Sequence, residues 1–207
     1  DDANARKHFE AALAIDQKFF PAMENLDRLD IRAGNIPAVE KRMRDRLTAD
    51  PLDERSIIRL SSFLASQQRR AEAIELLESK AGGLPKSIEI RKALVRLYLA
   101  EADAQKAKKT SGDLATIAPD DVSLQRFVAQ AYVQAGDPQS AVEVMRVLVN
   151  KNPSDVALKL ALTQVLASAS PEEARTILED IRRADPSNVD ATVGLVNLAL
   201  AAKKVDE

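Results

Sequence analysis

Apolar side chains recur along the chain at spacings of three and four residues. In one kind of stretch a small residue precedes a larger apolar residue by four places, as Ala141 precedes Met145. In the other kind an apolar residue and a small one are followed by an aromatic or aliphatic one, as in Val128, Ala129 and Tyr132. These spacings place the residues on one helix face, so the chain is predicted to consist of paired amphipathic helices.

The pairs of helices repeat with a fixed period. Pro51, Pro85, Pro119 and Pro153 lie 34 residues apart, and Pro186 follows after 33. Because proline cannot continue a helix, each of these residues is predicted to end one unit and to begin the next. A period of this size is typical of a solenoid, in which each unit buries its apolar face against its neighbours.

The period divides residues 1–207 into a single predicted array. Residues 1–19 are interpreted as the second helix of a partial repeat and 189–207 as the first helix of another. Between them the pattern predicts five full repeats, at 20–53, 54–87, 88–121, 122–155 and 156–188. The expected fold class is therefore all-α, an α-solenoid of about twelve helices. Since the array starts and stops within a repeat, we expect the chain to be a fragment of a longer protein.

The small and large positions, the closing proline and turns such as Ala33-Gly34-Asn35 together resemble the tetratricopeptide repeat (TPR). Three successive steps of 34 residues count against the 35-residue pentatricopeptide repeat. The resemblance covers essentially the whole chain. It implies a right-handed superhelix that acts as a non-catalytic scaffold and binds a partner protein or peptide in a concave groove lined by the first helices.

Residues 5–16 and 19–26 also resemble the long TPR lipoproteins of Gram-negative exopolysaccharide and PEP-CTERM (exosortase) systems. That resemblance implies a periplasmic or cell-envelope protein that helps to assemble or export a surface polysaccharide. Without it, a cytoplasmic location is the expectation.

Composition narrows the possible chemistry. The chain has no Cys, so disulfides and thiolate metal sites have no residues to build them, and its one His, His8, belongs to no recognisable Ser/His/Asp pattern. It contains no GxxxxGK[ST] phosphate loop and no apolar run near the ~20 residues that a membrane span needs. We therefore expect no catalytic residues, no metal, no cofactor and no membrane span in this segment.

Candidate binding residues remain on the first helices after the packing positions are removed. They form pairs at i,i+4 spacing, namely Arg28/Arg32, Arg55/Arg59, Lys92/Arg96 and Arg126/Gln130. This stripe predicts a basic groove and an acidic partner. The alternative is that local ion pairs absorb the charge, because Glu24 precedes Arg28 by four residues and Glu89 precedes Lys92 by three.

Two other functions stay open. A nucleic-acid-binding helical repeat would need a strongly basic groove with stacking aromatic residues, and only Phe127 lies near the stripe, so no nucleic acid is expected. The chain could instead be the recognition arm of a larger enzyme such as a glycosyltransferase. The basic run at 41–46 is interpreted as a solvated helix face around Met43.

Some repeats depart from the pattern. Asp27 and Asp30 stand at packing positions of the repeat 20–53. Ser111 and Gly112 interrupt the helix predicted at 105–117, which is expected to be the least stable one because glycine lowers helix stability by ~1 kcal/mol relative to alanine.

The helices at the two ends lack a neighbour in the pattern. Helix 3–16 is expected to expose Phe9 and Leu13, and helix 189–202 to expose a face drawn from Leu195, Leu198 and Leu200. Since the two faces are halves of one repeat, a weak head-to-tail self-association is predicted.

Overall fold

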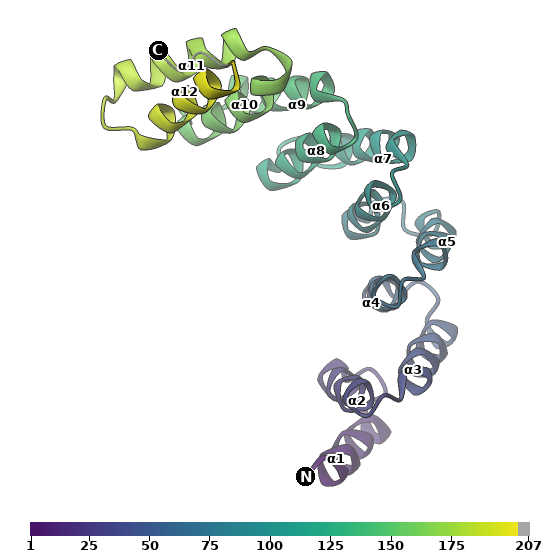
Figure 1. Cartoon of the computed structure of the whole chain (residues 1–207). Coiled ribbons are helices and arrows are strands. Elements are labelled where there is room, and N and C mark those ends of the chain that lie inside the picture. The colour runs from purple at the N-terminus through teal and green to yellow at the C-terminus, as the bar shows by residue number, and fades with distance from the viewer. Residues whose placement is uncertain (203–207) are drawn as a thin grey trace. The chain divides into compact units, whose positions relative to one another are not determined.

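The computed structural model of the chain describes residues 1–202, which form helices and no strand (Figure 1). The all-α prediction is confirmed. The helices of this described part are α1 (Asp2–Ile15), α2 (Phe20–Arg32), α3 (Ile36–Ala49), α4 (Glu54–Ser66), α5 (Arg70–Ala81), α6 (Ile88–Ala100), α7 (Ala104–Ile117), α8 (Val122–Gln134), α9 (Pro138–Lys151), α10 (Val156–Ala169), α11 (Pro171–Ala184) and α12 (Val189–Ala201).

The chain divides into two compact units. The N-terminal unit comprises Asp1–Pro85 and holds α1 to α5, and the C-terminal unit begins at Lys86 and holds α6 to α12. The division of the chain into one continuous array of repeats stays a prediction. None of the helices in residues 1–202 combines the length and apolar character that crossing a bilayer would require.

In the N-terminal unit each helix packs against the next along the chain. The first helices of the repeats, α2 and α4, lie on one side, and the second helices α3 and α5 lie on the other (Figure 1). The small and large positions of the repeat form the core, because Ala73 and Leu77 are fully buried, as are Ile57 and Leu60 on the facing helix. Burial of each large aliphatic side chain stabilises the fold by about 2 kcal/mol.

The C-terminal unit has the same packing. Ala141 and Met145 on α9 and Ala174 and Leu178 on α11 are buried in one apolar cluster with Leu166 of α10. A second cluster joins α6, α7 and α8. In both units, first helices thus pack against second helices.

The departures in α7 have a packing role. Ser111 is fully buried, and its hydroxyl has no hydrogen-bond partner among the described residues. A Cβ on Gly112 would lie 3.1 Å from the Tyr132 hydroxyl of α8. The glycine therefore gives the Tyr132 side chain room to lie against α7.

One backbone conformation recurs every 34 residues. Gly34 and Gly136, in the turn after a first helix, have φ of 73° and 75°, and Gln68 and Ala102, at the same position in the repeats between them, have φ of 62° and 57°. This left-handed region costs a residue with a Cβ ~1 kcal/mol or more, whereas glycine enters it freely.

We therefore expect Ala102→Gly to raise the free energy of unfolding by about 0.5–1 kcal/mol, since relief of the left-handed strain exceeds the added chain entropy of glycine. Urea unfolding followed by circular dichroism measures the change. Ala93→Gly, in the middle of α6, is the matched control and should lower stability by about 1 kcal/mol. A destabilised Ala102→Gly variant would contradict the account.

The exposed faces at the two ends differ from the prediction at one helix. In α1 no side chain is fully buried, and Phe9 and Leu13 are half-buried, as expected. In α12 the prediction for Leu198 was wrong, because it is 8% exposed and packs with α10 and α11, and Leu195 packs beside it.

The apolar stripe that α12 leaves exposed consists of Val189, Val193, Val196 and Leu200, which are 50–70% exposed. Their spacing places them on the face that points away from α11. We call this set the α12 stripe.

Candidate functional site

The eight predicted binding residues lie on the first helices, two on each of α2, α4, α6 and α8. Because α2 and α4 belong to the N-terminal unit and α6 and α8 to the C-terminal unit, each half is described by itself. The two halves differ in how much of their charge is neutralised by neighbouring carboxylates.

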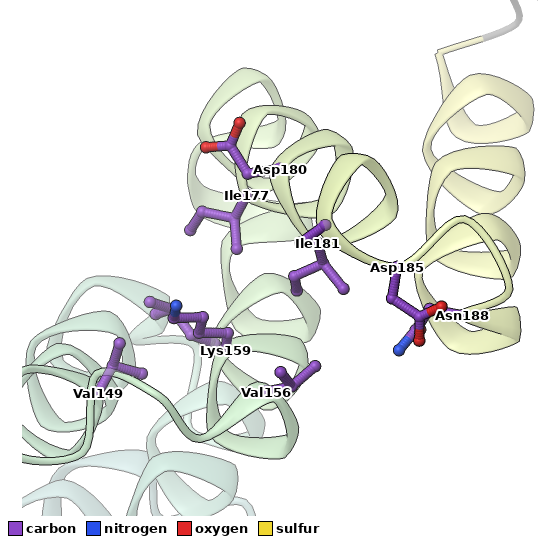
Figure 2. A pocket seen from close by; sticks show the side chains of 10 residues that line it. Val149, Val156, Lys159, Ile177, Asp180, Ile181, Asp185 and Asn188 are labelled. Carbon is purple, nitrogen blue, oxygen red and sulfur yellow. The ribbon is translucent and has the colours of Figure 1, made fainter.

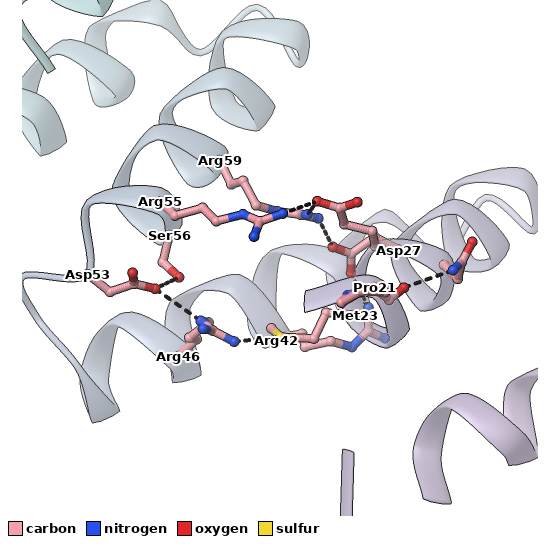
Figure 3. Close-up of polar contacts among 11 residues, drawn as sticks. Pro21, Met23, Asp27, Arg42, Arg46, Asp53, Arg55, Ser56 and Arg59 are labelled. Carbon is pink, nitrogen blue, oxygen red and sulfur yellow. Dashed lines mark hydrogen bonds and ion pairs between the residues drawn. The ribbon is translucent and has the colours of Figure 1, made fainter. Parts of the chain in front are cut away.

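In the N-terminal unit the arginines of α4 pair with acids of α2. The Arg59 guanidinium donates hydrogen bonds to Glu24 and Asp27, at 2.6 Å each, and Arg55 donates to Glu24 at 3.1 Å (Figure 3). Ion pairs therefore absorb this charge, as the alternative interpretation expected, but they cross from helix to helix. Glu24 pairs with α4 and not with Arg28 of its own helix.

The two aspartates at packing positions of α2 form the centre of a buried network. Asp27 and Asp30 are 4% and 1% exposed. Arg42 of α3 donates to both carboxylates, and Arg6 of α1 donates to Asp30 at 2.5 Å (Figure 3 shows the Asp27 side). With Arg59, three arginines from three neighbouring helices compensate the two carboxylates. We call Arg6, Asp27, Asp30, Arg42 and Arg59 the α2 charge network.

The basic run at 41–46 is therefore not a uniformly solvated face. The side chains of Arg42 and Arg46 are only 23% and 11% exposed, so the interpretation was wrong for these two. Arg42 turns inward because Asp27 and Asp30 attract it, and Arg46 lies 3.8 Å from the centroid of the Phe20 ring and 3.2 Å from Asp53. Lys41, Arg44 and Asp45 are exposed, as that interpretation requires.

The network changes the acidity of its members. Burial alone would raise the pKa of Asp30, but hydrogen bonds from Arg6 and Arg42 outweigh it and leave this pKa below its ordinary value. At Asp27 burial is the stronger influence and raises the pKa, although Arg42 and Arg59 oppose it. The pKa values of Asp53 and Glu40 are also lowered: at Asp53 hydrogen bonds from Ser56 and Arg46 outweigh burial, and at Glu40 the Arg69 hydrogen bond contributes most.

The lowered pKa values predict that acid destabilises the N-terminal unit. Asp30, Asp53 and Glu40 have folded-state pKa values below their unfolded values, so they stabilise the fold above about pH 4 and lose that contribution as the pH falls further. Unfolding free energy measured between pH 3 and pH 6 should therefore drop at the acidic end.

Two variants test the opposite pKa shifts assigned to Asp30 and Asp27. In Asp30→Asn the free energy of unfolding should fall less steeply as the pH is lowered, because this variant lacks a carboxyl whose pKa is lowered by folding. In Asp27→Asn it should fall more steeply, because a raised folded-state pKa favours the folded form at low pH. Equal slopes for both variants and the parent would contradict it.

The two remaining arginines of α2 are exposed. Arg32 pairs with Asp2 at 3.3 Å. Arg28 makes no ion pair with any described residue. It is the α2 member of the predicted stripe that keeps its charge unneutralised.

In the C-terminal unit the cations surround an aromatic ring. Lys92 pairs with Glu89 at 2.9 Å, as the local alternative expected, and its ammonium lies 5.8 Å from the centroid of the Phe127 ring. The guanidinium of Arg96 lies 5.3 Å from the same centroid. Arg96 and Arg126 are exposed, and neither forms an ion pair within residues 1–202.

A cavity of about 410 Å³ lies between these two first helices. We call it the α6–α8 groove, and it is lined by Arg96, Leu99, Ala100, Phe127, Gln130, Ala131 and Gln134. Its floor is apolar, and a guanidinium and two exposed amide side chains stand around it. Such groups bind an extended segment through hydrogen bonds to its carbonyl and carboxylate oxygens. Among the described residues, no three His, Asp or Glu side chains are grouped so as to hold a metal ion.

The repeats, their helix pairs and the groove on the first helices define a tetratricopeptide repeat protein. Residues 48–207 match the family described as "Protein kinase G tetratricopeptide repeat". This match covers more than half of the chain, so the chain belongs to that family. No curated protein matches the chain.

Solved structures share the fold at low sequence identity. A tetratricopeptide repeat protein from Parabacteroides merdae ATCC 43184 is 16% identical, with a TM-score of 0.63 over 89% of this chain and 74% of that one. PilF of Pseudomonas aeruginosa is 15% identical, with a TM-score of 0.56 over 92% and 87%. YrrB, described as a TPR protein with an unusual peptide-binding site, is 14% identical, with a TM-score of 0.53 over 78% and 84%.

Proposed function

We propose that the protein is an interaction scaffold that binds an acidic peptide segment of a partner in the α6–α8 groove. The observation that carries the proposal is the contrast between the two pairs of first helices. Arg55 and Arg59 are neutralised by carboxylates of α2, whereas Arg96 and Arg126 have no carboxylate partner in the described chain. The peptide-binding description of YrrB supports a peptide as the ligand class.

Residues in the groove and beside it have separate roles in this proposal. Arg96 and Arg126 attract carboxylates of the segment and raise its association rate. Phe127 provides an apolar contact beside those charges, and Gln130 donates to or accepts from the peptide backbone. Lys92 adds charge near the ring, but Glu89 already neutralises part of it.

The proposal is tested with peptides selected on the full chain from a random 12-residue library. The selected peptides should be enriched in Asp and Glu, and Arg96→Glu should weaken their binding by about tenfold, since it replaces attraction by repulsion. Binding should also weaken as salt rises.

The matched control is Arg28→Glu, which changes an exposed, unpaired arginine of α2 outside the groove. It should leave affinity within about twofold of the parent. Equal losses in the two variants, or selected peptides without acidic residues, would contradict the proposal.

A second function is a recognition module within a larger protein. The family name associates such repeats with a protein kinase, which favours an enzyme as the larger protein over an isolated scaffold. The full reading frame that encodes residues 1–207 is the test, and a frame without a catalytic domain would contradict it.

A location in the bacterial cell envelope, within an exopolysaccharide or protein-sorting assembly, is a further part of the proposal. It rests on the resemblance of residues 5–16 and 19–26. Fractionation of the source cells with an antiserum against the chain tests it, and recovery in the cytoplasmic fraction alone would contradict it.

Weak head-to-tail self-association is proposed between the exposed face of α1 and the α12 stripe. The residues of the α12 stripe are 50–70% exposed, and Phe9 and Leu13 of α1 are half-buried. Sedimentation velocity over a wide concentration range should show association that Val193→Glu abolishes. Association that survives this substitution would contradict the end-face contact.

A further inference from the structure

A second cavity lies in the C-terminal unit, on helices other than α6 and α8. It has a volume of about 320 Å³ and lies at the carboxyl ends of the second helices α9 and α11 and the amino end of α10 (Figure 2). We call it the α9–α11 crevice. Its apolar lining includes Val149, Val156, Leu162, Ile177 and Ile181, and Lys159 lines one side.

The same place in the repeat holds a cavity of about 320 Å³ in the N-terminal unit. Helix α11 is the equivalent of α3 four repeats further along the chain. Because the repeat 156–188 is one residue short, equivalent residues of the two helices differ in number by 135, which is four times 34 less one. Asp45 and Ala49 of α3 thus correspond to Asp180 and Ala184 of α11, and all four line their cavities. The crevice is therefore a recurring feature of the repeat.

The two cavities have the same volume of about 320 Å³ and differ in the residues around them. In the N-terminal unit Arg46 stacks on Phe20, contacts the Met23 sulfur and pairs with Asp53. At the equivalent positions the C-terminal unit has Ile181 for Arg46, Val156 for Phe20, Lys159 for Met23 and Asn188 for Asp53. A smaller apolar residue replaces the ring, an aliphatic residue replaces the guanidinium and a lysine replaces the methionine, so the crevice has an aliphatic lining with a lysine on one side.

The charges around the crevice are not equivalent. Asp180 accepts a hydrogen bond from Arg183 at 2.7 Å, and its carboxylate points away from Lys159 (Figure 2). Asp185 accepts bonds from the backbone N–H and the hydroxyl of Ser187, at 3.0 and 2.6 Å. Lys159 is half-buried and has no ion pair or hydrogen bond within the described residues. Among the charged side chains that line the crevice, that of Lys159 is therefore the one with neither a hydrogen bond nor an ion pair in the described chain.

We propose that the α9–α11 crevice is a second binding site, which takes a partner segment that presents an aliphatic or aromatic side chain next to a carboxylate. The apolar side chain fills the space between Val156, Ile177 and Ile181, and the carboxylate pairs with Lys159. This site is separate from the α6–α8 groove, because the two cavities share no lining residue. Its main requirement is an apolar side chain, and its second requirement is a single carboxylate.

Small probes separate the two requirements. The full chain is labelled with ¹³C at the methyl groups of Ile, Leu and Val and is titrated with N-acetyl-leucine, which has both groups. N-acetyl-leucinamide lacks the carboxylate, and acetate lacks the apolar side chain. We expect N-acetyl-leucine to shift the methyl signals of Val156, Ile177 and Ile181, the amide to bind about fivefold more weakly, and acetate to shift none of them.

Two substitutions introduce the residue that the N-terminal unit has at the same place. Lys159→Met, with methionine as at position 23, should make N-acetyl-leucine bind no better than the amide. Val156→Phe, with phenylalanine as at position 20, puts a larger side chain into the apolar lining and should weaken the binding of N-acetyl-leucine and of its amide alike. Lys109→Met is the control, since Lys109 is exposed on α7 and makes no ion pair in the described chain.

Equal affinity of the two leucine probes for the parent chain would overturn the carboxylate assignment. Shifts confined to Leu99 in the α6–α8 groove, or no shift in any crevice methyl up to the solubility of N-acetyl-leucine, would overturn the site itself. These results leave the proposal for the α6–α8 groove unaffected, because that proposal is tested through Arg96.

Discussion

Arg42→Met is expected to lower the free energy of unfolding of the N-terminal unit by about 3 kcal/mol or more. Arg42 donates to Asp27 and Asp30, two carboxylates that are almost completely removed from solvent. Without it Asp30 keeps Arg6 and Asp27 keeps Arg59, but neither carboxylate keeps its full set of donors. A buried charge that loses a partner costs far more than an exposed one. Amide hydrogen exchange of α2 and α3 measures the loss.

The control for this prediction is Arg28→Met. Arg28 lies on α2, is exposed and has no ion pair with the described residues, so its replacement should change stability by less than about 0.5 kcal/mol. Adding Asp27→Asn and Asp30→Asn to Arg42→Met should recover part of the loss, because neutral amides need no cation. Similar stability of the Arg42 and Arg28 variants would contradict the role assigned to the network.

Gly194→Leu is expected to detach α12 from α11, at a cost of about 2–3 kcal/mol. A Cβ at position 194 would lie 2.9 and 3.0 Å from the two δ-methyl carbons of Leu178, which is 1% exposed. Because Leu178 is enclosed by the apolar cluster of the C-terminal unit, it has no free space to move into. The helix that carries the larger residue must then move. Amides of α12 should exchange much faster, and those of α9 should not.

Leu178→Ala in the same chain should restore part of the protection of α12, because it vacates the volume that the new leucine needs. Gly82→Leu is the matched control in the N-terminal unit. No atom lies within 4 Å of a Cβ built there, and Gly82 has an ordinary helical φ of -64°. Loss of stability in Gly82→Leu as large as in Gly194→Leu would show that helix packing is not the cause.

The periodicity of the sequence was sufficient to predict the helices and their packing faces. Ala73 and Leu77, Ala141 and Met145 stand at the small and large positions and are buried. Such contacts lie within one helix pair, so spacing of three and four residues encodes them directly.

The α2 charge network could not be predicted in the same way. Asp27 and Asp30 were recognised as departures from the packing pattern, but their partners lie 12 to 32 residues away on other helices. Local rules pair Glu24 with Arg28 at i+4, and a rule of this kind contains no information on contacts between helices. A usable signal was the combination of acids at packing positions with arginines in the adjoining helices.

The exposed face of α12 was assigned to partly wrong residues because nearly all of its side chains are apolar. Leu198 and Val196 are both aliphatic, and only packing against α10 and α11 separates the buried one from the exposed one. Of the residues that line the α6–α8 groove, the sequence identified Arg96 and Gln130 as candidates, and Lys92 and Arg126 lie on the same two helices outside the lining. The cavity beside them depends on side chains from two helices and needed the structure.

The tyrosine that lies against Gly112 has an optical consequence. The chain has no tryptophan and two tyrosines, and both of these, Tyr98 and Tyr132, lie in the C-terminal unit. Tyrosine emission of the folded protein therefore comes from α6 and α8 alone, while helicity measured by circular dichroism comes from both units. Melting curves recorded with the two signals will coincide if the units unfold as one cooperative body and will separate if they do not. The native sequence thus contains a reporter for coupling between its units, and no label has to be added.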